Sequence, residues 1–467
     1  MRWYLVVSSL SVPRYSKYRS DVRFGCIIFA WTSSTGEMGV KAESTLVGLK
    51  YPSLRDEKLK TGVGWLRGKR EDDGAEGLWR VGDKLYDLDG WARNHPGGAE
   101  WITLTQGTDI TEAFEAHHVS LLAERLLPKF YVRDAATPRA CPLTFEPDGF
   151  YRTFKARARE ALKGVNFHRS SKKSNLTADL LCATTLFLCL TAAATESWIA
   201  IVGGGIFLTW TAISGHNFLH QRDSFRMYYM DLCPMSSKEW RITHALSHHM
   251  YTNTLLDIEI SMFEPVFEYL PRADKGPISR YAPWLYTPIV YMTTYFVHGF
   301  KRFYSAFFES NGPEFRDGIP FVIPVLMCLA AASPLSALWI WLKIVTVGSF
   351  HFTFVGLNAA HHHPDIYHDG DVRREDTDWG LEQLDAVRDR VEIETSFFLV
   401  LTNFGSHSLH HLLPTVDHAY LPLCEPAFQK TCREFGVDTS LWTQWKLTKG
   451  QFRQLANVEP KTTPNVR

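Results

Sequence analysis

Apolar residues are concentrated between residues 176 and 357, whereas both ends of the chain are mostly polar. The apolar pattern predicts four membrane-spanning helices, over residues 176–194, 198–213, 319–332 and 335–357. The first three are close to or below the roughly 20 residues that a straight span needs. We therefore expect two helical hairpins and leave the exact helix ends open.

The charges around these hairpins predict their orientation. Eight Lys and Arg residues lie between residues 152 and 173, whereas the hairpin turns at 195–197 and 333–334 contain none. Because basic residues stay on the cytosolic side, both termini are expected in the cytosol. The apolar stretch 284–296 contains three tyrosines and is expected to be a helix at the membrane surface. A further span there would move the later histidines to the opposite side of the membrane.

The polar region before the spans has a different pattern. Residues 79–81 and 84–88 predict two short strands joined by a turn at Gly82-Asp83, and helical segments follow as far as residue 118. We expect a multidomain chain, with an α+β domain followed by an all-α integral membrane domain that has four transmembrane helices. The expected division is an extension of unknown role (1–44), the α+β domain (45–135), a basic linker (136–174), the membrane domain (175–430) and a cytosolic tail (431–467).

Composition narrows the range of functions. Lys and Arg number 50, as do Asp and Glu, so that the net charge is zero and no nucleic-acid partner is indicated. The eight cysteines are scattered without a C-x-x-C pair, which favours a reducing, cytosol-facing environment. Gly203-Gly204-Gly205 lies within an expected span and favours helix packing over nucleotide binding. Lys343 also lies within a span, where a charge is costly unless it reaches the interface or a cavity.

Histidines recur in three stretches at spacings of three or four residues. On an α-helix, His244 and His248 would share one face, with His249 rotated by about 100°. Imidazoles repeated in this way are typical of metal ligands rather than of a packed core. The stretches together predict a multi-histidine metal site formed by His216 and His220, by His244, His248 and His249, and by His407, His410 and His411.

A fourth histidine lies in the turn His95-Pro96-Gly97-Gly98, after the predicted hairpin. This turn resembles the signature of the cytochrome b5 haem-binding domain. The resemblance implies haem b with His95 as one axial ligand and a second histidine opposite. We assign the second ligand to His118, which lies four residues after Phe114, and expect His117 to face solvent. Two histidine ligands leave no open iron position, which suits electron transfer.

Residues 175–425 resemble the membrane fatty acid desaturase family, and the fusion with a haem domain resembles the cytochrome b5-related proteins. The resemblance implies two non-haem irons held by the histidines named above. It also implies a ligand from the stretch after the fourth span, where His361 and His362 both remain candidates and Asn358 would contact a metal through water. His407 departs from one pattern of this family, since many cytochrome b5-fused desaturases that insert double bonds on the carboxyl side have Gln at the start of this third histidine stretch.

These features together predict an oxidoreductase that uses O2 to desaturate a fatty acyl-CoA or acyl-lipid. Electrons would come from the fused haem and, before that, from a separate cytochrome b5 reductase that uses NAD(P)H. The expected location is the endoplasmic reticulum membrane, with the active site in the cytosol. Two alternatives stay open: a fatty acid or sphingolipid hydroxylase, and a membrane electron carrier whose diiron half is inactive.

Overall fold

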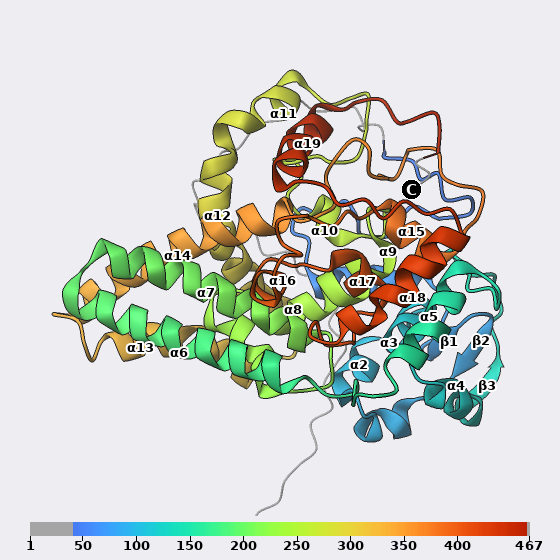
Figure 1. Cartoon of the computed structure of the whole chain (residues 1–467), viewed down its shortest axis with the longest axis horizontal. Coiled ribbons are helices and arrows are strands. Elements are labelled where there is room, and N and C mark those ends of the chain that lie inside the picture. The colour runs from blue at the N-terminus through green and yellow to red at the C-terminus, as the bar shows by residue number, and fades with distance from the viewer. Residues whose placement is uncertain (1–40, 465–467) are drawn as a thin grey trace, which may run out of the picture. The chain divides into compact units, whose positions relative to one another are not determined.

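The computed structural model describes residues 41–464, and Figure 1 shows the order of the elements. Most of the expected N-terminal extension, together with the last three residues of the tail, therefore lies outside the described residues. The remaining chain is mainly helical, with one small sheet near its N-terminal end.

The first part of the described chain is the expected α+β domain. Its sheet has the order β1 (Trp79–Val81), β2 (Lys84–Tyr86) and β3 (Tyr131–Asp134), with antiparallel neighbours. The hairpin between β1 and β2 is confirmed, and Gly82 supplies the positive φ that its turn needs. The helical elements of this domain are α1 (Gly62–Asp72), η1 (Asp89–Asn94), α2 (Ala99–Leu104), α3 (Thr111–His117), α4 (Leu122–Leu126) and η2 (Leu127–Phe130).

Three of the four expected spans are helices that are long and apolar enough to cross a membrane. They are α6 (Lys172–Thr195), α7 (Trp198–Leu219) and α14 (Pro334–Leu357). The third expected span, residues 319–332, instead forms the end of η6 (Phe315–Phe321) and the short helix α13 (Val322–Met327). Pro320 lies within η6 and Pro324 in the first turn of α13, and neither supplies the backbone N–H that a continuous α-helix would use there.

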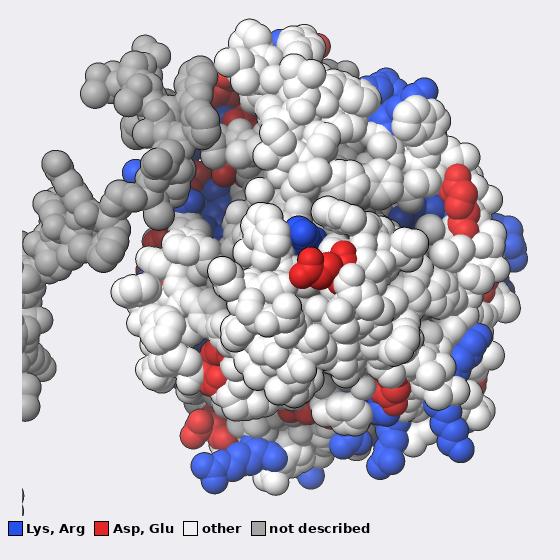
Figure 2. Space-filling model, turned by 90° about the vertical axis from the view of Figure 1, so that its left-hand side faces the viewer, with Lys and Arg blue, Asp and Glu red and all other residues white. Residues whose placement is uncertain are grey.

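The two hairpin turns meet at one end of the helical bundle. Ser336 Oγ, at the start of α14, donates to Glu196 Oε1 in the turn after α6, over 3.0 Å. His216 lies at the opposite end of α7, and His361 follows the opposite end of α14. Figure 2 looks onto the turn end, where uncharged side chains predominate and charged ones gather mainly toward the rim. The Lys343 ammonium lies 4.9 Å from the ring of Trp198, a cation–π contact that offsets part of its burial.

Helix α12 (Pro283–Tyr304) contains the segment expected at the membrane surface. It packs along α14 and buries Tyr291 and Tyr295 on that side. Its other side exposes several large apolar residues, a pattern typical of a helix that lies against lipid. The exposed residues include Trp284, Leu285, Ile289, Phe296 and Phe300.

The remaining elements cover the histidine-bearing end of the bundle (Figure 1). Several of them pack around a core that includes Trp379, Leu384 and Leu412, and α10 and α19 contribute to a second core with Ile260 and Leu455. These elements are α5 (Phe150–Ala161), η3 (Phe225–Leu232), α8 (Ser237–Trp240), η4 (Arg241–His248), α9 (His249–Tyr251), α10 (Ile258–Ser261), α11 (Pro277–Tyr281), η5 (Ser305–Glu309), α15 (Trp379–Asp385), α16 (Phe397–Thr402), α17 (His407–Leu412), α18 (Leu421–Glu434) and α19 (Gln444–Ala456).

Candidate metal centres

Nine buried histidines converge in two groups at the end of the helical bundle. In each group, one ring nitrogen per residue lies within 4.8 Å of the others. The first group combines the end of α7 with η4, α9 and α17, and the second combines η4 and α17 with the loop after α14. The first group is His216, His220, His244, His249 and His410, and the second is His248, His361, His407 and His411.

The geometry of helix η4 determines to which of the two groups each of its histidines belongs. It is a π-helix, in which the His249 N–H bonds to the His244 carbonyl five residues earlier. His244 and His249 therefore share the first group, and His248 points to the second. The sequence had placed His244 and His248 on one face, as in an α-helix. In the structure the two rings do stack, with centroids 5.2 Å apart, but the wider turn also brings His249 into the group of His244, which an α-helix would not do.

The facing ring nitrogens are spaced like ligands of a shared ion. In the first group, His216 Nε2 lies 2.8 Å from His244 Nε2 and 2.9 Å from His220 Nε2. In the second, His361 Nε2 lies 2.7 Å from His407 Nε2 and 3.2 Å from His248 Nε2. Two nitrogens bound at about 2.1 Å and at right angles to one ion would lie about 3 Å apart.

The positions of the ring protons in the second group explain why these short nitrogen–nitrogen distances indicate a metal ion. The Nδ1 atoms of His361 and His407 lie 2.9 and 3.1 Å from the carbonyl oxygens of Ala386 and Phe404, which only accept hydrogen bonds. Each neutral ring therefore carries its proton on Nδ1. Its Nε2 then presents a lone pair to the other Nε2. Two facing lone pairs repel each other unless a cation lies between them, so the arrangement fits a metal ion.

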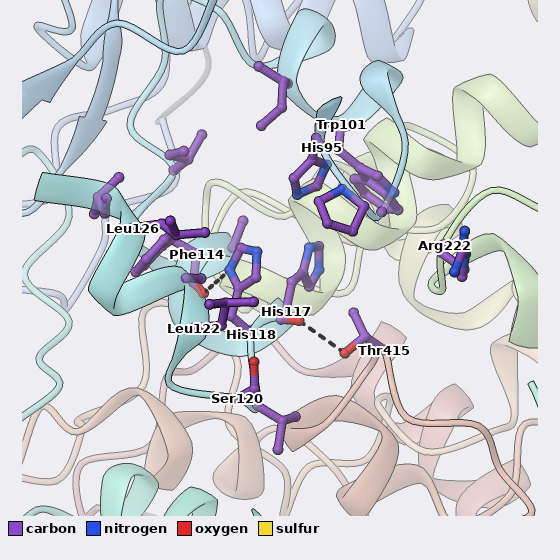
Figure 3. Close-up of a pocket in the computed structure, with 18 of the residues that line it drawn as sticks. His95, Trp101, Phe114, His117, His118, Ser120, Leu122, Leu126, Arg222 and Thr415 are labelled. Carbon is purple, nitrogen blue, oxygen red and sulfur yellow. Dashed lines mark hydrogen bonds between the residues drawn. The ribbon is translucent and has the colours of Figure 1, made fainter. Parts of the chain in front are cut away.

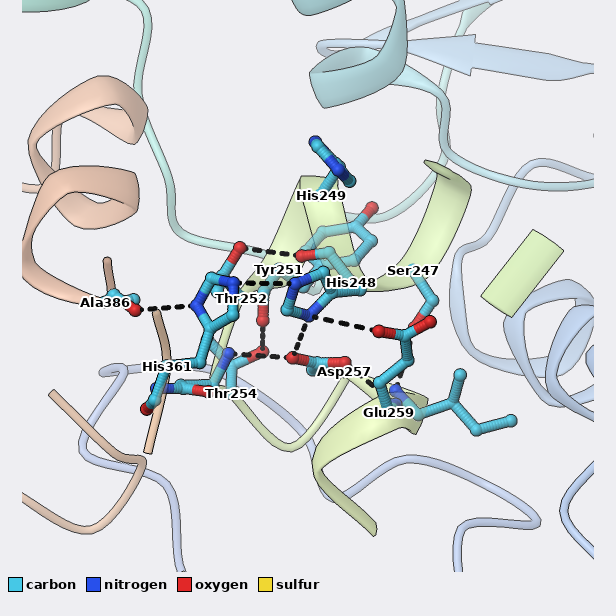
Figure 4. Close-up of polar contacts among 12 residues, drawn as sticks. Ser247, His248, His249, Tyr251, Thr252, Thr254, Asp257, Glu259, His361 and Ala386 are labelled. Carbon is cyan, nitrogen blue, oxygen red and sulfur yellow. Dashed lines mark hydrogen bonds and ion pairs between the residues drawn. The ribbon is translucent and has the colours of Figure 1, made fainter. Parts of the chain in front are cut away.

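Two carboxylates near η4 hold the rings from outside (Figure 4). Asp257 Oδ2 accepts from His248 Nδ1 over 2.9 Å, and both oxygens of Glu259 lie 3.2 Å from His244 Nδ1. Such outer partners fix the tautomer and orientation of metal-binding imidazoles. The sequence analysis missed both residues. The available signal was an Asp and a Glu just after a histidine box.

Burial also keeps the rings neutral. Desolvation lowers the pKa of His249, His407 and His411 well below the ordinary value, so these imidazoles are unprotonated at neutral pH. Burial likewise lowers the pKa of His248, but the charges of Asp257 and Glu259 outweigh it and leave that pKa raised. Burial raises the pKa of the Glu259 carboxyl to about 7. Neutral imidazoles are the form that binds metals.

The structure separates His361 from His362. The His361 ring joins the second group, whereas the ring of His362 stacks on Tyr269 with centroids 3.6 Å apart and belongs to neither group. The expected contribution of His362 as a ligand is therefore not met by this geometry, because consecutive side chains diverge after α14. Asn358 is also outside both groups, and its amide nitrogen donates to the Phe354 carbonyl over 2.8 Å.

The haem residues face each other in a cavity of about 420 Å³ (Figure 3). The ring centroids of His95 and His118 lie 6.1 Å apart, which accommodates one iron bonded at about 2 Å to each ring. Their Nδ1 atoms lie 2.9 and 2.8 Å from the carbonyl oxygens of Gly98 and Phe114, so each Nε2 is free to bind a metal. The wall is mostly apolar and includes Leu88, Ile102 and Phe130, as a porphyrin requires.

His117 does not face solvent as the sequence analysis expected. Its Nε2 is buried and has no hydrogen-bond partner among residues 41–464. Its ring packs edge-on against Trp101 at 5.1 Å, on the side of the cavity that meets the membrane domain. The choice of His118 as the residue opposite His95 is the one that the geometry favours.

Comparison with known proteins gives the same two-part division. The fatty acid desaturase family matches residues 191–441, and the cytochrome b5-like heme/steroid binding domain matches residues 68–136. A cytochrome b5-related protein of Drosophila melanogaster is 43% identical over 419 residues, which cover 89% of this chain and 96% of that protein.

More distant relatives include the acyl-lipid (8-3)-desaturase of Mortierella alpina, which is 22% identical over 76% of this chain and 87% of its own length. The acyl-lipid (8-3)-desaturase of Physcomitrium patens is 23% identical over 80% of this chain and 86% of its own length. No solved structure matches the chain. The chain belongs to the fatty acid desaturase family and carries an N-terminal cytochrome b5-like domain.

Proposed function

We propose that this protein is an O2-dependent desaturase of fatty acyl-CoA or acyl-lipid substrates, with haem b in its first domain and two irons in its histidine groups. The observation that carries the proposal is the pair of imidazole groups whose facing nitrogens need a cation between them. The acyl-lipid desaturases among the relatives support the choice of substrate class.

The two histidine groups would each hold one iron. Irons held by imidazoles supply oxygen chemistry that can remove hydrogen from an unactivated C–H bond. Asp257 and Glu259 orient the rings of His248 and His244 and keep their outward nitrogens engaged. Because these contacts are buried, the ligand set is held in place before any substrate arrives.

A cavity of about 90 Å³ lies against rings of both groups. Its histidine side includes His244 and His407, and its other walls include the apolar side chains of Phe263, Phe352 and Leu357. Such walls exclude water and accept methylene groups, which fits the part of an acyl chain that reacts. We infer that these walls bring the chain's C–H bonds to the histidine groups.

His95 and His118 would hold the haem, which supplies one-electron transfer and no open position for oxygen. A desaturation needs two electrons that neither the imidazoles nor the acyl chain provides. We expect a separate cytochrome b5 reductase to reduce the haem with NAD(P)H. Within the proposal, the protein lies in the endoplasmic reticulum membrane, with both termini and the histidine groups on the cytosolic side.

The test is lipid analysis of cells that contain a reductase and express the parent or a variant. The parent is expected to give acyl chains that have lost two hydrogens, and His410→Ala to give none. The matched control is His351→Ala, which removes an imidazole of α14 outside both groups. Acyl chains that instead gain one oxygen would make the protein a hydroxylase. No lipid change in any host given varied acyl chains would leave only the electron-carrier function.

A further inference from the structure

The haem cavity is bounded by both domains. Besides the haem-domain residues, its wall includes His220, Arg222, Leu246 and Thr415 from the desaturase domain (Figure 3). His220 belongs to the first histidine group. One cavity therefore reaches from the proposed haem ligands to a proposed iron ligand.

The loop after His220 contacts the haem-binding turn directly. The Asp223 N–H donates to the Gly97 carbonyl over 3.0 Å. Gly98 has a φ of +119°, and a Cβ there would lie 2.2 Å from Asp223 Oδ2. On the other side, Thr415 Oγ1 donates to the His117 carbonyl over 3.1 Å. The second glycine of the turn thus permits the close approach of the two domains.

Charged side chains reinforce this contact. Arg241 lies three residues before His244 on η4 and is fully buried. Its guanidinium donates to Glu100 over 2.7 Å and to Asp223 over 2.6 Å. Arg316 donates to the other oxygen of Glu100 over 2.6 Å.

The surroundings of Glu100 keep it charged. Although burial raises the pKa of Glu100, the positive charges of Arg316 and Arg241 lower it below its ordinary value. The Arg241 guanidinium also lies 4.7 Å from the ring of Trp101, which is adjacent to Glu100 on α2. Arg241 is buried and Glu100 only partly exposed, so separating this hydrogen-bonded pair would leave the buried guanidinium as an uncompensated charge.

We propose that Glu100, Arg241 and Arg316 form a clamp that holds the haem cavity against His220, so that the haem delivers electrons to the histidine groups without the domain leaving its docked position. The inference rests on the proposed function. Each delivery would transfer one electron from the haem held by His95 and His118 to an iron held by the histidine groups, with no bond made or broken. The three clamp residues are positioning residues, since they act by fixing the separation of the two centres.

The test uses the full-length protein loaded with haem and iron. The haem is reduced, oxygen is added, and haem reoxidation is followed by its absorption. Glu100→Gln keeps the shape of the side chain but removes its charge, and is expected to slow reoxidation about tenfold or more, as loss of one charge of a partly buried, hydrogen-bonded pair implies. The haem spectrum, haem potential and iron content should stay unchanged. Glu76→Gln is the matched control, since Glu76 pairs with Arg133 within the haem domain.

Two further substitutions, His248→Ala and Arg316→Gln, distinguish a failure of the clamp from a failure of the proposed function. His248→Ala shows whether fast reoxidation in the parent depends on the histidine groups, which is the electron delivery of the proposed function. If it does, and Glu100→Gln reoxidises as fast as the parent, the clamp is refuted and the proposed function stands. Arg316→Gln should slow reoxidation in the same way, and the double variant should be little slower than either single one, because both changes break one contact.

Hydrogen exchange tests the clamp without any electron transfer. Segments 97–104 and 220–224 should exchange faster in Glu100→Gln than in the parent or in Glu76→Gln. Unchanged exchange would overturn the clamp. If His248→Ala had no effect on reoxidation, the electron delivery of the proposed function would fail, and exchange alone would then decide whether Glu100 holds the domains together.

Discussion

The haem cavity and the histidine groups both orient imidazole rings for metal binding, but the contacts that orient the rings differ. In the haem cavity, both facing histidines come from one short stretch, and carbonyls three or four residues away orient them. In the second histidine group, His407 is oriented by the nearby Phe404 carbonyl, but His361 is oriented by Ala386 and His411 by Gln383, which lie on other segments. A local motif therefore builds one site, whereas tertiary packing builds the other.

Because the two sites are built differently, we expect them to respond differently to amino-acid substitutions. A site built locally tolerates distant changes and fails when one of its two ligands is lost. A site built from four stretches depends on ligands, on their outer partners and on the packing of the helices that carry them. Four substitutions compare the two sites, from the largest expected effect to the smallest.

The largest effect is expected at the loop after α14. His361→Ala should remove the iron of the second group and reduce product formation below detection, because the three remaining imidazoles no longer surround the ion. His362→Ala is the matched control and should keep both irons, since its ring stacks on Tyr269. Iron per chain and lipid product measure the effect. Equal iron loss in the two variants would contradict the assignment.

The sequence predicted the residue types of both sites, but it did not predict how the nine histidines divide between the two groups. Helical spacing named eight of them, and the family resemblance left His361 and His362 open. The division of the histidines between the two groups depends on the π-helical turn in η4, and no residue pattern in the sequence predicted that turn. The third expected span is built from short helical segments instead of one long helix, and Pro320 and Pro324 lie within these segments.

In the haem cavity, His118→Ala should abolish the low-spin haem spectrum and leave the non-haem iron in place. The ring of His118 faces His95 at 6.1 Å, in the position that a second axial ligand would occupy. His117→Ala should keep the spectrum, because its ring packs on Trp101 instead. Absorption spectra and iron analysis of both variants provide the measurement. A lost spectrum in His117→Ala would move the axial ligand to that residue.

A smaller effect is expected from the outer partner of His248. In Asp257→Asn, the amide nitrogen can donate to His248 Nδ1, which would shift the ring proton to Nε2 and block that nitrogen from metal. Iron affinity of the second group should fall about 10- to 100-fold. Chelator titration measures this change, with the exposed Asp56→Asn as control. Unchanged affinity would show that Asp257 does not set the tautomer.

The smallest effect is expected where the two regions share a side chain. Tyr151 is fully buried, and its hydroxyl lies 3.2 Å from the Glu115 carbonyl of the haem domain and 3.3 Å from the Leu412 carbonyl beside the third histidine box. Tyr151→Phe removes that donor from two buried carbonyls and should cost about 1 kcal/mol of stability. Both metal contents should stay normal while the unfolding midpoint in detergent falls by about 2 °C. Loss of iron in this variant would mean that the histidine groups depend on the domain contact as closely as on their own ligands.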